Sequence, residues 1–350
     1  ASSLVFVFAS AAASAAAVCI TLVIVLDCLM TFFGSTANDA AFNAWVTDNT
    51  RPAFRGKVEG VLAVLPLVAM LIVAGGFGIL VTLIGYSGLF LSLGAVIVLC
   101  GVGGLFLIRD SGELVRSGRL RDVSYGFRPS VIKSNVPLYL TLIIMGVYGV
   151  ACQIFMPYLI IYMKTYLGFS VIEYSIVFGL AIILGALINL LLGGLTDRID
   201  KVRLLYPAVA VLALGLLGMY LARTEGHLLT LILFGLAGFV MITGYILVSA
   251  LSGALVRNYT PAKEAGKLQG IRMIFSVLIP MLAGPAIGNA INRAANIPLP
   301  DQGSADTMTT QFIPAPEIFL AGAITCLLIL VCIPLLSRAV RKQTNASTED

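Results

Sequence analysis

The sequence predicts an all-α protein that crosses a membrane about ten times. Hydrophobic residues make up 59% of the 350 residues and charged residues only 11%, which leaves too few polar side chains to cover a soluble domain of this size. The apolar residues also gather in runs that approach or exceed the roughly 20 helical residues needed to cross a hydrocarbon core. Ten spans are expected, at approximately residues 2–18, 19–46, 56–82, 86–108, 138–166, 171–194, 204–222, 228–256, 268–291 and 318–336.

The first of these boundaries rests on length alone. Residues 2–46 contain no proline and no basic turn, yet a single helix of that length would overshoot a bilayer. Two spans are therefore expected there.

Basic residues predict the orientation of the spans. Almost all lysines and arginines outside the spans fall in loops on one side, whereas the other side holds only Lys164, Arg223 and Arg293. Short loops rich in Lys and Arg stay in the cytoplasm, so we expect a multi-pass plasma-membrane protein with a cytoplasmic C-terminus. The net charge of +5 then reflects topology, and the expected partners are lipid and a small-molecule substrate, with no nucleic acid and a monomeric state.

A charged hairpin is expected at residues 193–201, Gly-Gly-Leu-Thr-Asp-Arg-Ile-Asp-Lys, between two apolar runs. The segment resembles the signature loop of the major facilitator superfamily of transporters. Asp200 stands where that family usually has glycine, and an ordinary basic turn is the alternative. The resemblance implies a conformational gating role for Gly193, Asp197 and Arg198, with Arg272 as a candidate partner of Asp197. The positions that fit the family pattern are Gly193, Leu195, Asp197, Arg198, Lys201 and Arg203.

An internal repeat supports a two-part architecture. Residues 55–61, Arg-Gly-Lys-Val-Glu-Gly-Val, align with residues 265–271, Ala-Gly-Lys-Leu-Gln-Gly-Ile, and Thr50 then falls on Thr260. Both copies open a long apolar run. Many secondary transporters consist of two parallel repeats, although chance similarity between two Gly-Lys-x-x-Gly helix starts is the alternative.

The family resemblance also implies a register for the helices. If residues 193–203 join the eighth and ninth helices of a twelve-helix plan, residues 2–18 are the third helix and the first two are absent. A genuine ten-helix protein is the alternative. The expected domains are an N-terminal bundle of helices 3–6, a central cytoplasmic loop, a C-terminal six-helix bundle and a cytoplasmic tail, at residues 1–108, 109–137, 138–336 and 337–350.

Polar residues inside apolar spans are costly and indicate function. In the second span, Asp27 and Asp39 share one helical stripe with other polar residues, completed by Thr31, Ser35 and Asn38. Asp39 is the leading cation or sugar-hydroxyl ligand, because a carboxylate binds H⁺ or Na⁺ and accepts hydrogen bonds from hydroxyls. Its surroundings loosely resemble the fourth helix of the melibiose-permease group, the glycoside-pentoside-hexuronide:cation symporters. A structural role, with Asp39 bonded to a neighbouring helix, is the alternative.

Further site residues are expected in the C-terminal half and at one helix start. Tyr148 and Gln153 lie in the fifth span, where they can hydrogen-bond a polar solute. Glu59, within about one turn of Arg55 and Lys57, is expected to belong to a solvated helix start, with a gating salt bridge as the alternative. Arg257 is expected in a cytoplasmic loop.

Secondary active transport by alternating access is the expected function. No Gly-x-x-x-x-Gly-Lys-Ser/Thr nucleotide loop occurs in the sequence, so we expect coupling to H⁺ or Na⁺ and no other cofactor. The expected cargo is a small polar solute of the sugar or glycoside class, and drug or metabolite efflux by proton antiport is the alternative. An integral-membrane enzyme or a receptor is a second alternative, but no catalytic or metal-binding cluster supports an enzyme, and no loop is long enough for a soluble receptor domain.

Overall fold

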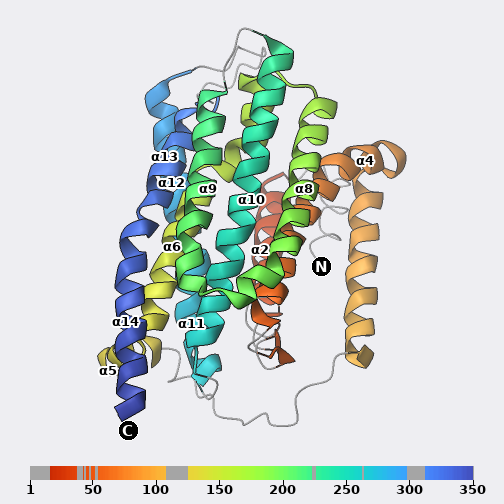
Figure 1. Cartoon of the computed structure of the whole chain (residues 1–350). Coiled ribbons are helices and arrows are strands. Elements are labelled where there is room, and N and C mark those ends of the chain that lie inside the picture. Colours follow the sequence, from red (N-terminus) through yellow and green to blue (C-terminus); the bar gives the residue numbers. More distant parts are fainter. Residues whose placement is uncertain are drawn as a thin grey trace. The chain divides into compact units, whose positions relative to one another are not determined.

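The computed structural model describes residues 16–37, 42, 45–46, 49–51, 54–107, 125–222, 226–261, 264–297 and 312–349. The elements of these residues are helices, as the composition predicts (Figure 1). Seven of the described helices are long and apolar enough to cross a membrane. They confirm a polytopic all-α membrane protein, and they extend over Leu83–Phe106, Val136–Tyr166, Val171–Asn189, Lys201–Leu221, His227–Tyr259, Gly266–Ala295 and Glu317–Gln343.

The chain divides into two compact units. The first comprises Ala1–Thr50 and Ala69–Arg119, and the second comprises Arg51–Val68 and Leu120–Asp350. Helix α2 (Ala16–Ser35) belongs to the first unit. It runs without interruption through the expected boundary between residues 18 and 19, and this corrects that boundary. The physical reason is that no proline, glycine or charged residue stands there to end a helix.

Helix α4 (Arg55–Leu107) contains two predicted spans joined at a break. Gly85 adopts φ 68° and ψ 172° at this point, a backbone conformation that side chains other than glycine rarely tolerate. The break falls between residues 82 and 86, where the sequence places the boundary between its third and fourth spans. The first turns of α4 belong to the second unit and the rest to the first.

The second unit is a helix bundle built around α6 and α10. Helix α6 (Val136–Phe155) follows the short α5 (Pro129–Ser134) and continues through η4 (Met156–Tyr158), α7 (Leu159–Ile161) and η5 (Tyr162–Tyr166). Helix α10 (His227–Tyr259) packs against α6, against α8 (Val171–Arg198) and most extensively against α9 (Lys201–Leu221). The remaining elements are α11 (Ala265–Met273), η7 (Ile274–Leu278), α12 (Ile279–Ala295), α13 (Glu317–Leu327) and α14 (Ile329–Glu349).

Glycines allow two helix pairs to approach closely. On the α9–α10 interface, a Cβ added to Gly215 would overlap the backbone of Met241, and one added to Gly244 would overlap that of Leu212. On the α6–α12 interface, Gly149 faces Pro280 and Gly288 faces the carbonyl oxygen of Ile154. Small residues at such positions let backbones pack directly, which is how membrane helices associate when burial of apolar surface contributes little.

Candidate functional site

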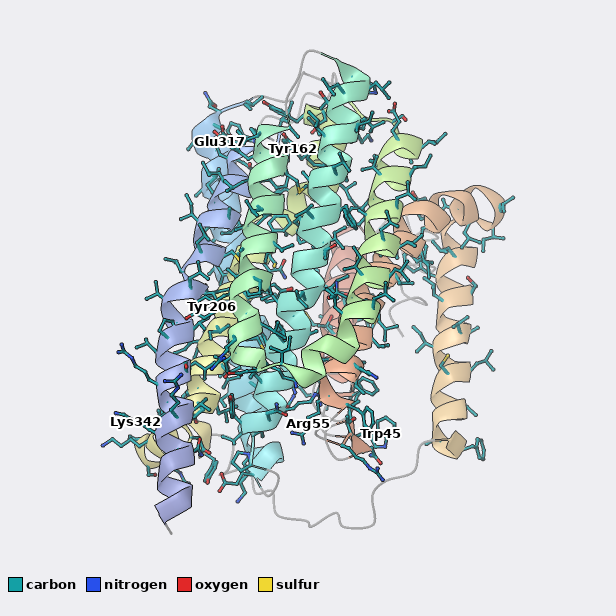
Figure 2. All side chains as sticks on the ribbon, viewed as in Figure 1. Trp45, Arg55, Tyr162, Tyr206, Glu317 and Lys342 are labelled. Carbon is teal, nitrogen blue, oxygen red and sulfur yellow. The ribbon has the colours of Figure 1, made fainter. Side chains whose placement is uncertain are left out.

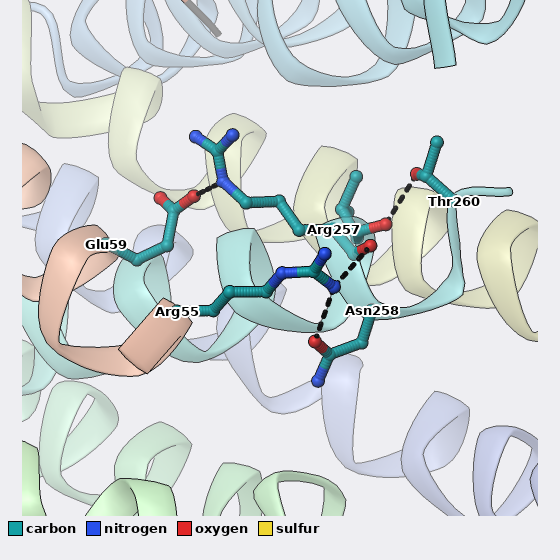
Figure 3. Close-up of polar contacts among 6 residues, drawn as sticks. Arg55, Glu59, Arg257, Asn258 and Thr260 are labelled. Carbon is teal, nitrogen blue, oxygen red and sulfur yellow. Dashed lines mark hydrogen bonds and ion pairs between the residues drawn. The ribbon is translucent and has the colours of Figure 1, made fainter. Parts of the chain in front are cut away.

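A buried ion pair connects the first turns of α4 with the last turn of α10. Arg257 Nε donates a hydrogen bond to Glu59 Oε1 (Figure 3), and only 2% of Arg257 and 8% of Glu59 remain exposed. The two residues are 198 positions apart in the sequence, and both belong to the second unit. The contact therefore joins a segment from the first half of the chain to one from the second half.

Arg55 adds a second attachment between the same helices. Its Nη1 donates to the carbonyl oxygen of Arg257 and to Oδ1 of Asn258, both at 3.1 Å (Figure 3). The last carbonyls of a helix lack partners within it and carry partial negative charge, so a guanidinium is favourable there. Burial lowers the pKa of Arg55 below its usual value, and the positive charge of Arg257 lowers it further. We call Arg55, Glu59, Arg257 and Asn258 the α4–α10 cluster.

Gly253 makes room for the Glu59 carboxylate. A Cβ added at Gly253 would lie 2.8 Å from Cδ of Glu59 and 2.5 Å from Oε2, closer than such atoms can approach. The glycine lies one turn before Arg257 on α10. The Glu59 carboxylate therefore packs directly against the Gly253 backbone while it accepts the hydrogen bond from Arg257. The fit depends on residue 253 having no side chain.

We expect Gly253→Ala to displace Glu59 and to destabilise the protein by about 1–3 kcal/mol, the usual range for overpacking a tight site. Thermal and denaturant unfolding in detergent would measure the loss. Gly60→Ala is the matched control, because an added Cβ there meets nothing within 4 Å. Equal stability of the two variants would contradict the packing of Glu59 against Gly253.

A second polar cluster holds the segment before α5 against α11. Tyr125 Oη donates to Oε1 of Glu264 at 2.8 Å, and Lys267 Nζ lies 5.3 Å from the centre of the Tyr125 ring. Nearby, Tyr139 Oη donates to the carbonyl oxygen of Gly126. Beneath these contacts lies an apolar core of Val131, Leu138, Tyr139, Leu142, Val256, Leu268 and Ile271. These contacts attach the segment before α5 to the start of α11 and to α6.

We expect Tyr125→Phe to lower the unfolding midpoint slightly and to remove a pH dependence at alkaline pH. The hydrogen bond to Glu264, together with some burial, raises the pKa of Tyr125. A raised folded-state pKa means that the stabilising contribution is complete below about pH 10, the ordinary tyrosine value, and is lost as pH rises through the raised pKa. Unfolding midpoints measured across this range should fall more steeply in the wild type than in the variant. Parallel curves would refute a role for this hydroxyl.

The two copies of the sequence repeat share one backbone hydrogen bond just before the helix. Phe54 N–H donates to the Arg51 carbonyl in one copy, and Glu264 N–H donates to the Pro261 carbonyl in the other, each at 3.0 Å. This shared contact favours duplication over chance similarity. The copies differ in charge, because Gln269 occupies the position that corresponds to Glu59.

The predicted charged hairpin joins α8 to α9. Helix α8 ends at Arg198 and α9 begins at Lys201. Asp200 caps α9, because its Oδ1 accepts the Val202 N–H at 3.0 Å, and it also lies 3.7 Å from Arg203. An aspartate at this position is therefore accounted for as a helix cap.

The hairpin and the repeat agree with a comparison against family models. A model of the Major Facilitator Superfamily matches residues 1–285. The chain belongs to this superfamily. It is therefore a membrane protein of the secondary-transporter class, as the signature loop predicts. A comparison with curated proteins gave no match.

In this superfamily member, the proposed cation ligand lies outside the described residues. Asn38 and Asp39 are not among them, so their role in binding stays a prediction. Asp27 is exposed on α2, where Thr31 is also exposed and Ser35 is partly buried. Because these residues belong to the first unit and Tyr148 and Gln153 to the second, no common binding surface is described.

Tyr148 and Gln153 both lie at contacts between helices of the second unit. Tyr148 is buried, and its Oη donates to the carbonyl oxygen of Tyr245 at 3.0 Å, with the two rings 5.7 Å apart. Gln153 is half-buried against α12, where a Cβ added to Gly284 would overlap it. In this conformation the Tyr148 hydroxyl serves α6–α10 packing.

The gating residues expected from the signature loop lie in two helices. Gly193, Asp197 and Arg198 belong to the last turns of α8, but their side chains are outside the described part. Arg272 is half-buried in α11. Its pairing with Asp197 therefore stays a prediction.

The structure corrects two expectations and adds one residue. Glu59 does not belong to a solvated helix start, because Gly253 leaves space for its carboxylate to be buried beside Arg257. Arg257 does not lie in a loop, because α10 continues to Tyr259. Asn189, which sequence reasoning missed, is buried on α8, and its Nδ2 donates to the carbonyl oxygens of Gly185 and Thr243. An amide inside an apolar run was the signal for it.

Proposed function

We propose that this protein moves a small polar solute of the sugar or glycoside class across the plasma membrane by cation-coupled alternating access. Membership of the superfamily supports the general mechanism. The basic loops support a cytoplasmic C-terminus, and the stripe that contains Asp39 supports coupling to H⁺ or Na⁺ without another cofactor. The protein works as a monomer in the bilayer.

The observation that carries the mechanism is the buried ion pair of the α4–α10 cluster. Alternating access requires contacts at one side of the membrane that break when that side opens. Both helix ends in the cluster adjoin basic segments, which supports a cytoplasmic position for the cluster by the same charge rule. In this proposal, Glu59 and Arg257 hold that side closed, and both charges enter water when it opens.

The proposed substrate and coupling site can be tested by transport. Vesicles that contain the protein would be assayed for uptake of a labelled sugar panel under Na⁺ or proton gradients, with Asp39→Asn compared to Asp27→Asn. Gradient-driven uptake that is lost in Asp39→Asn and kept in Asp27→Asn supports a symporter with Asp39 in the site. Uptake that Asp39→Asn leaves intact makes Asp39 structural. Absence of uptake, with proton-driven extrusion of an apolar cationic dye, establishes the efflux alternative.

A further inference from the structure

A polar pocket of about 240 Å³ lies next to the α4–α10 cluster. It opens where the start of α6, the end of α10 and the last part of α14 meet, all within the second unit. Figure 2 shows this end of the unit, marked by Arg55 and Lys342, opposite the end that carries Tyr162 and Glu317. The pocket is lined by Asn135, Pro137, Leu138, Asn258, Tyr259, Thr260, Pro261 and Gln343.

The pocket wall offers hydrogen-bond donors. Asn258 Oδ1 already accepts from Arg55, so the side chain has its Nδ2 donors left for a ligand. Gln343, which is exposed, contributes a second side-chain amide to the pocket lining. Asn135 uses its Nδ2 for the carbonyl oxygen of Val131 and for Oγ of Ser134. Among the described residues that line the pocket, none is acidic.

Two lysines lie close to these amides in the sequence. Lys133 is two positions before Asn135, and Lys342 is next to Gln343; both are exposed. The Arg55 guanidinium adjoins the pocket through Asn258. On the α9 side, the carboxylate of Asp200 lies 3.7 Å from Nε of Arg203, which offsets its negative charge. The electrostatic balance around the pocket therefore favours an anion.

We propose that this pocket binds a phosphate group, supplied either by the headgroup of an anionic phospholipid or as free inorganic phosphate. Amide and ammonium N–H donors match the acceptor oxygens of phosphate, and basic pockets between helix ends are where anionic headgroups bind membrane proteins. A phosphate held by Asn258 would contact the residue that also holds Arg55. Occupancy therefore strengthens the attachment of α4 to α10 and stabilises the conformation described.

The two sources can be separated with the full chain in nanodiscs. Discs of phosphatidylcholine alone would be compared with discs containing one third phosphatidylglycerol, and inorganic phosphate would be titrated into the former. Unfolding midpoints report stabilisation, and native mass spectrometry reports retained lipid. The test variant is Lys133→Ala with Lys342→Ala. The control is Arg338→Ala with Arg341→Ala, which removes the same total charge, in this case two charges from α14, at positions rotated away from Gln343 on the helix.

The test variant should weaken binding about thirtyfold, in line with about 1 kcal/mol for each of the two lysines near an anionic surface, and the control should bind like the wild type. Retention of phosphatidylglycerol without a response to phosphate assigns the pocket to lipid. Stabilisation by phosphate in phosphatidylcholine discs assigns it to the free ion. No response to either, or equal weakening in both variants, overturns the proposal. Without ligand, both double variants must unfold within a few degrees of the wild type. If the lysine variant does not, Gln343→Ala takes its place as the test variant.

Discussion

Glu59→Gln is expected to lower the free energy of unfolding by about 3–5 kcal/mol, because it removes the carboxylate charge that pairs with the buried guanidinium of Arg257. Only 2% of Arg257 is exposed, so water cannot replace the lost carboxylate while α4 and α10 stay packed. Arg257→Gln should cost a similar amount for the converse reason. Denaturant titration in detergent micelles would measure both losses.

The double variant distinguishes a specific pair from two independent effects. Glu59→Gln combined with Arg257→Gln buries two neutral amides, so it should be more stable than the sum of the single losses predicts. Glu317→Gln is the control, because Glu317 is an exposed carboxylate at the start of α13, and it should change stability by less than about 0.5 kcal/mol. Additive losses in the double variant would show that the two side chains act separately.

The same variants bear on transport. If the pair closes the cytoplasmic side, as proposed, its loss shifts the population towards the conformation open on that side. A cysteine introduced beside the cluster should then react faster with a water-soluble maleimide in Glu59→Gln than in the wild type. An unchanged rate would leave the pair with a structural role only.

Hydropathy was sufficient to predict the seven apolar helices that the described residues form, because about 20 apolar residues are long enough to cross a bilayer wherever they pack. The break at Gly85 was placed correctly, since a glycine followed by a tyrosine interrupts the apolar run. The boundary at residue 18 was wrong, because length set it and no residue there ends a helix. Local signals thus located the elements only where a residue disturbs the helix.

The α4–α10 cluster required tertiary information. Glu59 has the sequence neighbours of a solvated helix start, with Arg55 and Lys57 within one turn, and nothing local pairs it with a residue 198 positions away. The repeat placed the two helix starts correctly but gave no indication of the charge pair, because Gln269 breaks the equivalence. Gly253 is the residue that determines the contact, and its role depends on what lies opposite it in space.

Gly215→Ala is expected to be the most damaging single-methyl change in the described helix interfaces, with a loss of about 3 kcal/mol, at the upper end of what overpacking usually costs. The added Cβ would overlap the backbone nitrogen and Cα of Met241, and backbone atoms cannot move aside as a flexible side chain can. Helices α9 and α10 must then separate along their most extensive contact. Unfolding in detergent, with helical circular dichroism as the signal, would measure the loss.

Gly238→Ala on α10 separates this packing effect from the general effect of replacing a helical glycine. Gly238 is buried like Gly215, but a Cβ added there meets nothing within 4 Å. Alanine favours a helix over glycine by up to about 1 kcal/mol, so this variant should be as stable as the wild type or more stable. Because both variants gain the same intrinsic helix propensity, the difference between them isolates the cost of forcing α9 from α10. A stable Gly215→Ala protein would mean that these helices are not in direct backbone contact.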